Sequence, residues 1–333
     1  MVEFEFKAYR RSFSEGYRTA SDSMLTRSGI ILRVADEEGR VGFGEVAPIE
    51  SFGTETFVSA VSTCSQLEGK IEYERVITEL KEHPCIRFGL ESAIRWAKCE
   101  NPWPKWSDPV SICGLLPDIN DRERLDKLLA DGFTHIKTKI GKAPFKVERR
   151  FLEEIFDRSD GCVKLRLDAN GGLDLRAARK WLESVSELPV EFIEQPMAKG
   201  EEATMFQLAM DYPVPIALDE SAVSMDDLKR WKDQHWTGLF VIKPSLSGSG
   251  RELKEEIGAW DPRSLVFSSS LETMIGSAHA LILALEVSRG TRALGFGVDS
   301  LFVDDGFSLG LGSLLDESEL PGQEDFESLW KRI

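Results

Sequence analysis

The sequence predicts an α/β fold in which a (β/α)8-type barrel follows a smaller N-terminal α+β domain. Short apolar segments alternate with helical patterns from about residue 106 to 298, as parallel strands joined by helices do. Five of these segments end in an ionisable residue at steps of roughly 24 to 29 residues, which accommodate one strand, one helix and two loops. No glycine-rich phosphate motif follows the first strand, at Cys113, although an open doubly wound sheet normally carries one. A barrel is therefore the favoured architecture.

Residues 1–105 are predicted to form an α+β capping domain in which the strands precede the helices. Strands are expected at residues 4–10, 29–35 and 41–46, and helices at 55–67, 72–82 and 88–99. The polar stretch 17–27 is predicted to be a flexible loop. A second loop, at 48–54, combines Pro, Gly and an aromatic residue.

Residues 106–298 are predicted to form the barrel, which begins after the proline-containing break NPWPKWSD at 101–108. Helices are expected at residues 121–131, 145–156, 176–185, 201–210, 228–234, 252–257 and 272–288. The strands alternate with them: one at 110–113, five that end near Lys139, Asp168, Glu194, Asp219 and Lys243, and two at 265–268 and 293–297. The remaining segment, 299–333, is acidic and contains a short helix near its end. We expect it to pack back on the capping domain.

The composition excludes several classes of partner. The net charge of −16 argues against nucleic acid and anionic membrane surfaces. The five cysteines are scattered without CxxC spacing, which predicts reduced thiols in a cytoplasmic protein and no zinc site. The longest apolar helical pattern is too short to span a bilayer. We expect a small-molecule partner, and the sequence does not indicate an oligomeric state.

Three carboxylates at matching positions predict a metal site. Asp168, Glu194 and Asp219 end three consecutive strands, and neighbouring strand ends in a barrel lie close together. Three anions this close repel one another unless a cation lies among them. Oxygen ligands of this kind suit Mg²⁺, for which Mn²⁺ is a workable substitute. Each acid alone could instead cap the following helix, but three at one spacing favour the metal.

Lysines at two strand ends predict base chemistry beside that metal. In THIKTKIG the alternation places Lys137 and Lys139 on one face of a strand, and Lys243 ends a strand across the barrel. Burial and nearby cations lower the pKa of a lysine, so a neutral amine becomes available as a base. These parts fit a reaction in which a lysine removes the proton alpha to a metal-bound carboxylate. A solvated lysine at the barrel rim is the alternative for each lysine taken singly.

The order of these residues resembles the muconate-lactonizing enzyme subgroup of the enolase superfamily. This resemblance implies an enolase-like barrel, for which seven full βα units are the alternative to eight. Several phrases are more specifically similar to the o-succinylbenzoate synthases: GFGEVAPIESFGTET (42–56), KTKIG (137–141), LRLDANGG (165–172), IEQP (193–196), LDES (218–221), VIKPSLSGS (241–249) and FSSSLET (267–273). The resemblance covers nearly the whole chain. It implies a hydro-lyase that dehydrates a cyclohexadiene carboxylate for menaquinone biosynthesis.

The resemblance also implies roles for individual residues. Asp168, Glu194 and Asp219 would hold Mg²⁺, Lys139 would remove the alpha proton and protonate the departing hydroxyl, and Lys243 would stabilise the anion from the other face. The residues implied in substrate binding are Lys137, Arg166, Asn170, Ser268, Ser269, Ser270 and Phe52. The serines could equally cap the next helix, and Phe52 could be an ordinary exposed loop aromatic. The loops at 17–27 and 48–54 would cover the mouth of the barrel.

Two rival functions remain. A dipeptide epimerase or N-acylamino acid racemase of the same superfamily uses the same two lysines. Dipeptide epimerases tend to carry an acidic DxD phrase after the eighth strand, whereas VDS at 298–300 lacks the second acid, although Asp304 and Asp305 follow. A binding protein on a degenerate barrel would have lost one or more of the ionic strand ends, and this sequence retains all of them.

Overall fold

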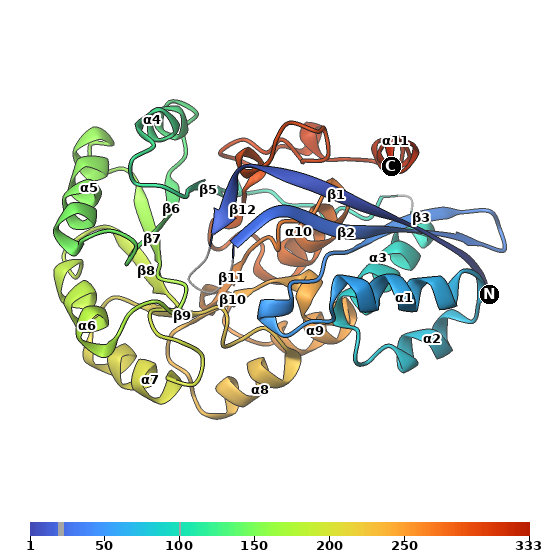
Figure 1. The fold of residues 1–333 in the computed structure, drawn as a ribbon, viewed down its shortest axis with the longest axis horizontal. Coiled ribbons are helices and arrows are strands. Elements are labelled where there is room, and N and C mark those ends of the chain that lie inside the picture. Colours follow the sequence, from blue (N-terminus) through green and yellow to red (C-terminus); the bar gives the residue numbers. More distant parts are fainter. Residues whose placement is uncertain (19–22, 100) are drawn as a thin grey trace.

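The computed structural model describes residues 1–18, 23–99 and 101–333, which form a capping sheet with its helices beside a barrel (Figure 1). The cap holds an antiparallel sheet of order β3-β2-β1-β4. Its elements are β1 (Val2–Arg18), β2 (Ser23–Asp36), β3 (Val41–Val46), β4 (Gly69–Ile71), η1 (Glu50–Phe52), α1 (Phe57–Leu67), α2 (Tyr73–Glu79) and α3 (Pro84–Lys98). This arrangement of strands and helices confirms the predicted α+β character of the capping domain.

The hairpin β1–β2 is longer than the sequence predicted. Cross-strand pairing runs from Val2 with Asp36 to Ser12 with Thr26, and resumes at Tyr17 with Met24 after an irregularity. The prediction of a flexible loop over 17–27 is therefore wrong for residues 17–18 and 23–27, which belong to strands. Residues 19–22 lie outside the described part of the chain. The prediction was wrong because it relied on polar composition. A two-stranded ribbon needs no apolar face where it extends beyond the rest of the sheet, so polar residues can form strands there.

Helix α3 lies directly against β3 because two glycines allow close contact. A Cβ on Gly42 would lie 1.9 Å from the carbonyl oxygen of Ala93, and a Cβ on Gly44 would lie 1.9 Å from that of Gly89. No side chain fits between these backbones. The core beneath includes Phe4, Leu32 and Leu90 and joins the sheet to α1, α2 and α3.

The second part is a parallel barrel, which confirms the predicted fold class. Its strands follow the order β11-β10-β9-β8-β7-β6-β5-β12, and a parallel bridge from Ser268 to Gly295 joins the two ends. They are β5 (Ile112–Leu116), β6 (His135–Lys139), β7 (Lys164–Asp168), β8 (Val190–Glu194), β9 (Ile216–Leu218), β10 (Leu239–Ile242), β11 (Leu265–Phe267) and β12 (Leu294–Gly297). The first strand begins two residues later than the expected residue 110.

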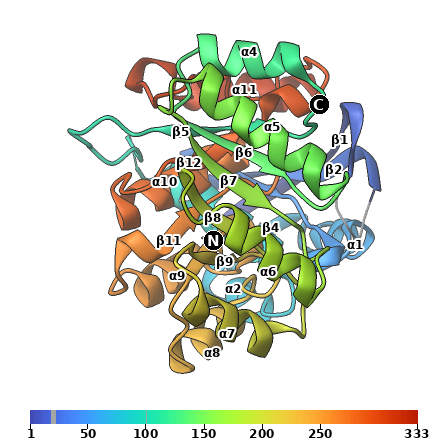
Figure 2. The same cartoon turned by 90° about the vertical axis from the view of Figure 1, so that its left-hand side faces the viewer.

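Seven of the eight barrel strands are each followed by an α-helix that covers the outside of the barrel. These helices are α4 (Arg122–Ala130), α5 (Phe145–Arg158), α6 (Leu175–Ser184), α7 (Glu202–Asp211), α8 (Met225–Asp233), α9 (Gly250–Ile257) and α10 (Met274–Ser288). Figure 2 shows α5, α6 and α7 in front of the strands that they follow. Short 3-10 turns complete the connections: η2 (Pro244–Leu246), η3 (Pro262–Ser264) and η4 (Asp299–Leu301). Outward-facing apolar side chains of the strands pack beneath the helices, so the inward-facing positions remain for the site.

The C-terminal segment connects the barrel back to the cap. It contains η5 (Glu317–Glu319) and α11 (Gln323–Arg332). Phe326 and Leu329 of α11 pack in one cluster with Tyr9, Phe43 and Trp96 of the cap. The end of the chain therefore stabilises the capping sheet.

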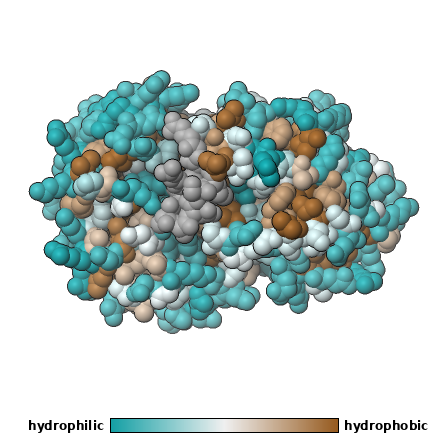
Figure 3. Space-filling view, viewed as in Figure 1, coloured by the Kyte–Doolittle hydropathy of each residue, from teal (hydrophilic) through white to brown (hydrophobic). Residues whose placement is uncertain are grey.

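Charged and polar residues cover most of the face shown in Figure 3, as the net charge of −16 leads one to expect. Among the described helices, none is both long and apolar enough to cross a membrane.

Candidate active site

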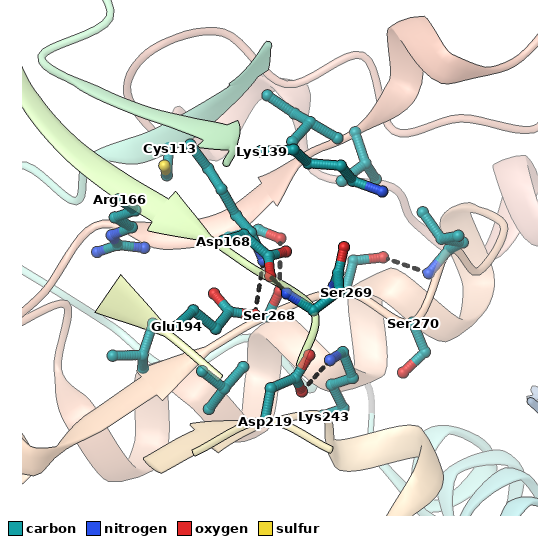
Figure 4. A pocket seen from close by; sticks show the side chains of 18 of the residues that line it. Cys113, Lys139, Arg166, Asp168, Glu194, Asp219, Lys243, Ser268, Ser269 and Ser270 are labelled. Carbon is teal, nitrogen blue, oxygen red and sulfur yellow. Dashed lines mark hydrogen bonds and ion pairs between the residues drawn. The ribbon is translucent and has the colours of Figure 1, made fainter. Parts of the chain in front are cut away.

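One cavity at the carboxyl ends of the barrel strands brings together every residue that the sequence assigned to the site (Figure 4). The predicted site residues that line it are Phe52, Lys137, Lys139, Arg166, Asp168, Asn170, Glu194, Asp219, Lys243, Ser268, Ser269 and Ser270. The capping domain contributes Ile49, Ser51 and Phe52, so both parts of the fold build its wall. Their location follows from the fold, because each charged strand end faces the same mouth.

The three acids lie at the ends of neighbouring strands and are almost completely buried. Asp168 and Glu194 are paired residues of β7 and β8, and Asp219 directly follows β9. Their exposed fractions are 1%, 2% and 3%. The Nζ of Lys137 lies 2.9 Å from Asp168 Oδ2 and 2.7 Å from Glu194 Oε1, and Lys243 forms an ion pair with Asp219. Two ammonium groups thus balance part of the negative charge.

Burial makes the remaining negative charge costly. It raises the pKa of Glu194 to about 8, with Asp168 and Asp219 adding repulsion and Lys137 opposing it. The pKa of Asp219 is also raised, chiefly by burial, against the attraction of Lys243. For Asp168, burial works in the same direction, but Lys137, Lys139 and the backbone N–H of Asn170 together outweigh it, and the pKa is lowered. A cation among these acids would relieve that cost.

The acids have the chemistry of a divalent-metal site. They offer carboxylate oxygens only, which suit a hard cation such as Mg²⁺. Within the described ranges, no three His, Cys, Asp or Glu side chains already stand together as a ready-made metal-binding group. The ammonium groups of Lys137 and Lys243 lie against the acids instead. The donor set therefore fits the ion, provided that these two lysines withdraw from the carboxylates.

Two lysines extend into the cavity from opposite sides of the acids (Figure 4). Lys139 ends β6 and is 6% exposed, and burial lowers the pKa of its ammonium group to about 8 against the attraction of Asp168. Lys243 follows β10, and its Nζ lies 4.4 Å from the ring centroid of Phe52. A planar substrate between these lysines would meet a base on one face and a cation on the other.

Arg166 lies two residues before Asp168 on β7, and therefore further from the carboxyl end of the strand. Its Nε donates to Glu191 Oε2 at 2.7 Å, and Glu191 also accepts from Arg292. In Figure 4 its guanidinium group points away from Asp168. Its buried Nη2 has no hydrogen-bond partner among the described residues. Arg166 thus lines the cavity wall while its ion pair stabilises the barrel interior.

Asn170 lies two residues after Asp168 and determines the backbone conformation at the end of β7. Its backbone N–H donates to Asp168 Oδ1 at 2.9 Å, and its φ of 44° lies in the left-handed region. Its side-chain Nδ2 is 3.4 Å from Glu220 Oε1. The buried Oδ1 has no partner within the described residues. This conformation orients the carboxylate of Asp168.

The three serines after β11 are already engaged within the protein. The N–H of Ser268 donates to Ile242 O, and that of Ser269 donates to Gly295 O. Glu272 Oε2 accepts from the Ser269 hydroxyl at 2.5 Å and from the Ser270 N–H at 2.8 Å. An anion site built from these N–H groups is therefore not what the structure shows. A role for the side chains of Ser268, Ser269 and Ser270 in substrate binding stays a prediction.

Sequence reasoning missed Gln195, which holds the third acid in place. Its Oε1 accepts from the backbone N–H groups of Asp219 at 3.0 Å and Ser221 at 3.3 Å. Its Nε2 donates to the Ser221 hydroxyl at 2.8 Å. The phrase IEQP contains this residue, but its role depends on a contact with the next strand that no local pattern reveals.

Comparisons with known proteins match both parts of the chain. Residues 120–295 match the family model "Enolase C-terminal domain-like", and residues 4–96 match "MenC, N-terminal domain". The o-succinylbenzoate synthase of Thermosynechococcus vestitus is 34% identical, over 90% of this chain and 93% of that protein. A hydrophobic dipeptide epimerase of a Flavobacteria bacterium is 27% identical, over 91% of this chain and 87% of that protein.

Solved structures extend the same comparison. The crystal structure of o-succinylbenzoate synthase from Thermosynechococcus elongatus, complexed with Mg in the active site, has a TM-score of 0.83 and 32% identity. It covers 99% of this chain and 100% of that one. The L-Ala-D/L-Glu epimerase of Bacillus subtilis has a TM-score of 0.82 at 21% identity, over 96% of each chain, and shares the fold.

Proposed function

The chain belongs to the o-succinylbenzoate synthase family of the enolase superfamily, carbon–oxygen lyases of the hydro-lyase type, and on that premise we propose its reaction. The reaction is the Mg²⁺-dependent syn dehydration of 2-succinyl-6-hydroxy-2,4-cyclohexadiene-1-carboxylate to 2-succinylbenzoate in menaquinone biosynthesis. The observation that carries it is the placement of Lys139 and Lys243 on opposite sides of three buried acids.

The acids Asp168, Glu194 and Asp219 would hold the divalent ion. When bound, Mg²⁺, or Mn²⁺ in its place, supplies a Lewis acid that fixes the substrate carboxylate and stabilises the negative charge developing on it. Lys137 lies between Asp168 and Glu194, where its ammonium can instead contact that carboxylate. Gln195 keeps Asp219 oriented through its backbone.

Lys139 moves the protons. As a neutral amine it takes the proton from the carbon alpha to the carboxylate, and the resulting ammonium then donates a proton to the hydroxyl on the adjacent ring carbon. The carbon–oxygen bond breaks, one water molecule leaves, and the ring becomes aromatic. Both proton transfers use the same face of the ring, which makes the elimination syn.

Lys243 stabilises the anion from the opposite face. Its ammonium lies 4.4 Å from the Phe52 ring centroid, and both side chains line the cavity. The aromatic ring shields this side from water, which strengthens the attraction between the ammonium and the developing anion. The 48–54 loop, which carries Phe52, thus contributes to the site from the capping domain.

Epimerisation of a dipeptide is the second candidate, favoured by the same pair of lysines. The acids near the eighth strand weigh against it, because they are engaged within the protein. Asp299 Oδ2 accepts from the N–H of Gly310 at 2.8 Å, and Asp305 accepts two hydrogen bonds from Arg11. Neither residue is among those that line the cavity.

Parallel assays of the purified protein with Mg²⁺ test the proposal. We expect rapid formation of 2-succinylbenzoate from the cyclohexadiene carboxylate, and far slower turnover of L-Ala-Glu and of an N-succinyl amino acid. Removal of the metal with EDTA should abolish the dehydration. Preferential epimerisation of the dipeptide, with no aromatic product from the diene, would replace this proposal with the second candidate.

A further inference from the structure

A cross-strand pair of arginines from the capping domain reaches into the barrel beside the candidate active site. Arg11 of β1 and Arg27 of β2 are register partners in the hairpin. Their exposed fractions are 2% and 3%, which is unusual for arginine. The proposed reaction assigns neither residue a role, so their burial calls for an explanation.

Arg27 connects four backbone carbonyl groups from two parts of the fold. Its Nη1 donates to Pro48 O at 2.6 Å and to Ser28 O at 3.3 Å, and its Nη2 donates to Ala47 O and, at 3.1 Å, to Ser270 O. Among the described residues it forms no ion pair with a carboxylate, and its buried Nε has no hydrogen-bond partner. A buried charge held only by carbonyl groups fixes the position of those groups at considerable cost.

Arg11 holds the carbonyl group two residues further along the same turn. Its Nη1 donates to Glu272 O at 3.2 Å, while Asp305 accepts from its Nε at 2.8 Å and from its Nη2 at 3.0 Å. The guanidinium carbon also lies 3.8 Å from the ring centroid of Phe302. The two arginines therefore bind the carbonyl groups on either side of Leu271.

Leu271 adopts a conformation that needs such support. Its φ of 65° lies in the left-handed region, which is unfavourable for a residue with a branched side chain. The side chain packs with Phe13, Leu115 and Phe302, and Leu271 lines the candidate active-site cavity next to Ser270. Glu272 completes the turn by accepting hydrogen bonds from Ser269 and Ser270. Without the arginines, an extended conformation would move Leu271 out of the cavity wall.

We propose that Arg11 and Arg27 are positioning residues. They hold the strained turn 270–272 and the loop 47–54 in fixed positions relative to each other, and so set the shape of the substrate cavity. Arg27 joins the carbonyl of Ser270, in the barrel wall, to the base of the loop that presents Phe52 to Lys243. Both segments line the side of the cavity that faces the cap, whereas Lys139 lies on β6. The pair governs substrate binding and leaves proton abstraction intact.

The variant Arg27→Met tests this inference, because Met keeps much of the length of the side chain and removes every donor. We expect KM for the cyclohexadiene carboxylate to rise at least about tenfold while kcat stays within about threefold, since loss of an interaction shared by ground and transition states appears in KM. Binding of 2-succinylbenzoate, measured by calorimetry with Mg²⁺, should weaken by a similar factor. Arg27→Lys should recover part of the loss, because one ammonium can replace one of the carbonyl contacts.

The matched control is Arg33→Met on the same strand, where Arg33 forms a partly exposed ion pair with Glu5. Its KM and kcat should stay at the wild-type values. An unchanged KM in Arg27→Met, or a fall in kcat alone as expected of partial unfolding, would overturn the inference. If Arg27→Met does not fold, Arg27→Lys must still raise KM, by the smaller factor of at least about threefold, or the inference is wrong.

The inference rests on the proposed function, but the two fail in different ways. Wild-type protein that forms no aromatic product contradicts the proposed reaction itself. Active wild-type protein with an unchanged KM in the Arg27 variants contradicts only the positioning role.

Discussion

At the residue scale, the proposed reaction assigns the central chemical step to Lys139. We expect Lys139→Ala to lower kcat by at least about 10⁴-fold, because both proton transfers lose their carrier and general acid–base effects of 10² to 10⁴ act in each. Mg²⁺ affinity, measured by calorimetry, should stay close to that of the wild type. The control Lys146→Ala removes an exposed lysine seven residues later and should leave kcat unchanged. Turnover near the wild-type rate in Lys139→Ala would contradict the assignment.

The lowered pKa of Lys139 predicts how the rate depends on pH. Burial lowers this pKa from 10.5 to about 8, and the base must be neutral to accept a proton. The neutral fraction grows as pH rises through 8, so kcat/KM should increase about tenfold per pH unit below 8 and level off above it. Initial rates measured between pH 6 and 9.5 at saturating Mg²⁺ check this. A rate that is flat or falls between pH 6.5 and 8 would contradict the role of Lys139 as base.

The sequence could predict which residues line the cavity because each charged group ends a strand or lies in a recognisable phrase. Asp168, Glu194, Asp219, Lys139 and Lys243 required only the spacing of βα units and the rule that strand ends converge. It could not predict Gln195, Arg11 and Arg27. Their roles depend on contacts with distant segments, such as the bond between Arg27 and the carbonyl of Ser270, 243 residues away.

At the element scale, the close contact of α3 with β3 positions the capping sheet. We expect Gly44→Ala to lower the free energy of unfolding by about 1–3 kcal/mol, because the added Cβ would meet the Gly89 carbonyl at 1.9 Å. Chemical denaturation followed by circular dichroism measures the change. Gly312→Ala is the control, since its nearest neighbouring atom would be 3.9 Å away. Equal stability of the two variants would mean that α3 can move away from the sheet without cost.

Element boundaries show where local pattern reasoning succeeded and where it failed. The barrel helices were predictable because their apolar faces repeat at helical spacing between short apolar strands. The strand residues 17–18 and 23–27 were not, because their strand conformation arises from pairing with a partner strand and not from their own composition. A polar stretch contains no signal that distinguishes a projecting ribbon from a loop.

At the scale of the whole molecule, the C-terminal helix connects the barrel to the cap. Phe326 is completely buried and contacts Trp96 and Phe43, with ring centroids 4.4 Å and 6.4 Å away. We expect Phe326→Ala to destabilise the protein by about 3–5 kcal/mol through lost burial and the cavity left behind. The midpoint of chemical unfolding should fall accordingly. Val303→Ala, at a side chain that is 52% exposed, should stay within about 0.5 kcal/mol of wild type, and an equal effect would contradict the packing role of α11.

The fold class and the two-part architecture were predictable from sequence because a βα repeat leaves few topologies open. How the parts meet was not predictable, since contacts such as those of Arg11 and Arg27 link segments more than 200 residues apart. The cavity needs both parts: the barrel supplies the acids and lysines, and the cap supplies Phe52. We therefore expect both parts to determine substrate specificity, whereas the proposed proton chemistry uses only barrel residues.

Proton NMR of the purified protein with 2-succinyl-6-hydroxy-2,4-cyclohexadiene-1-carboxylate and Mg²⁺ tests the central claim most directly. The account predicts that the aromatic signals of 2-succinylbenzoate appear with the wild type far faster than in buffer, and at the buffer rate with EDTA or with Lys139→Ala. Aromatic signals that never exceed the buffer rate with the wild type, or that appear equally fast with Lys139→Ala, would contradict it.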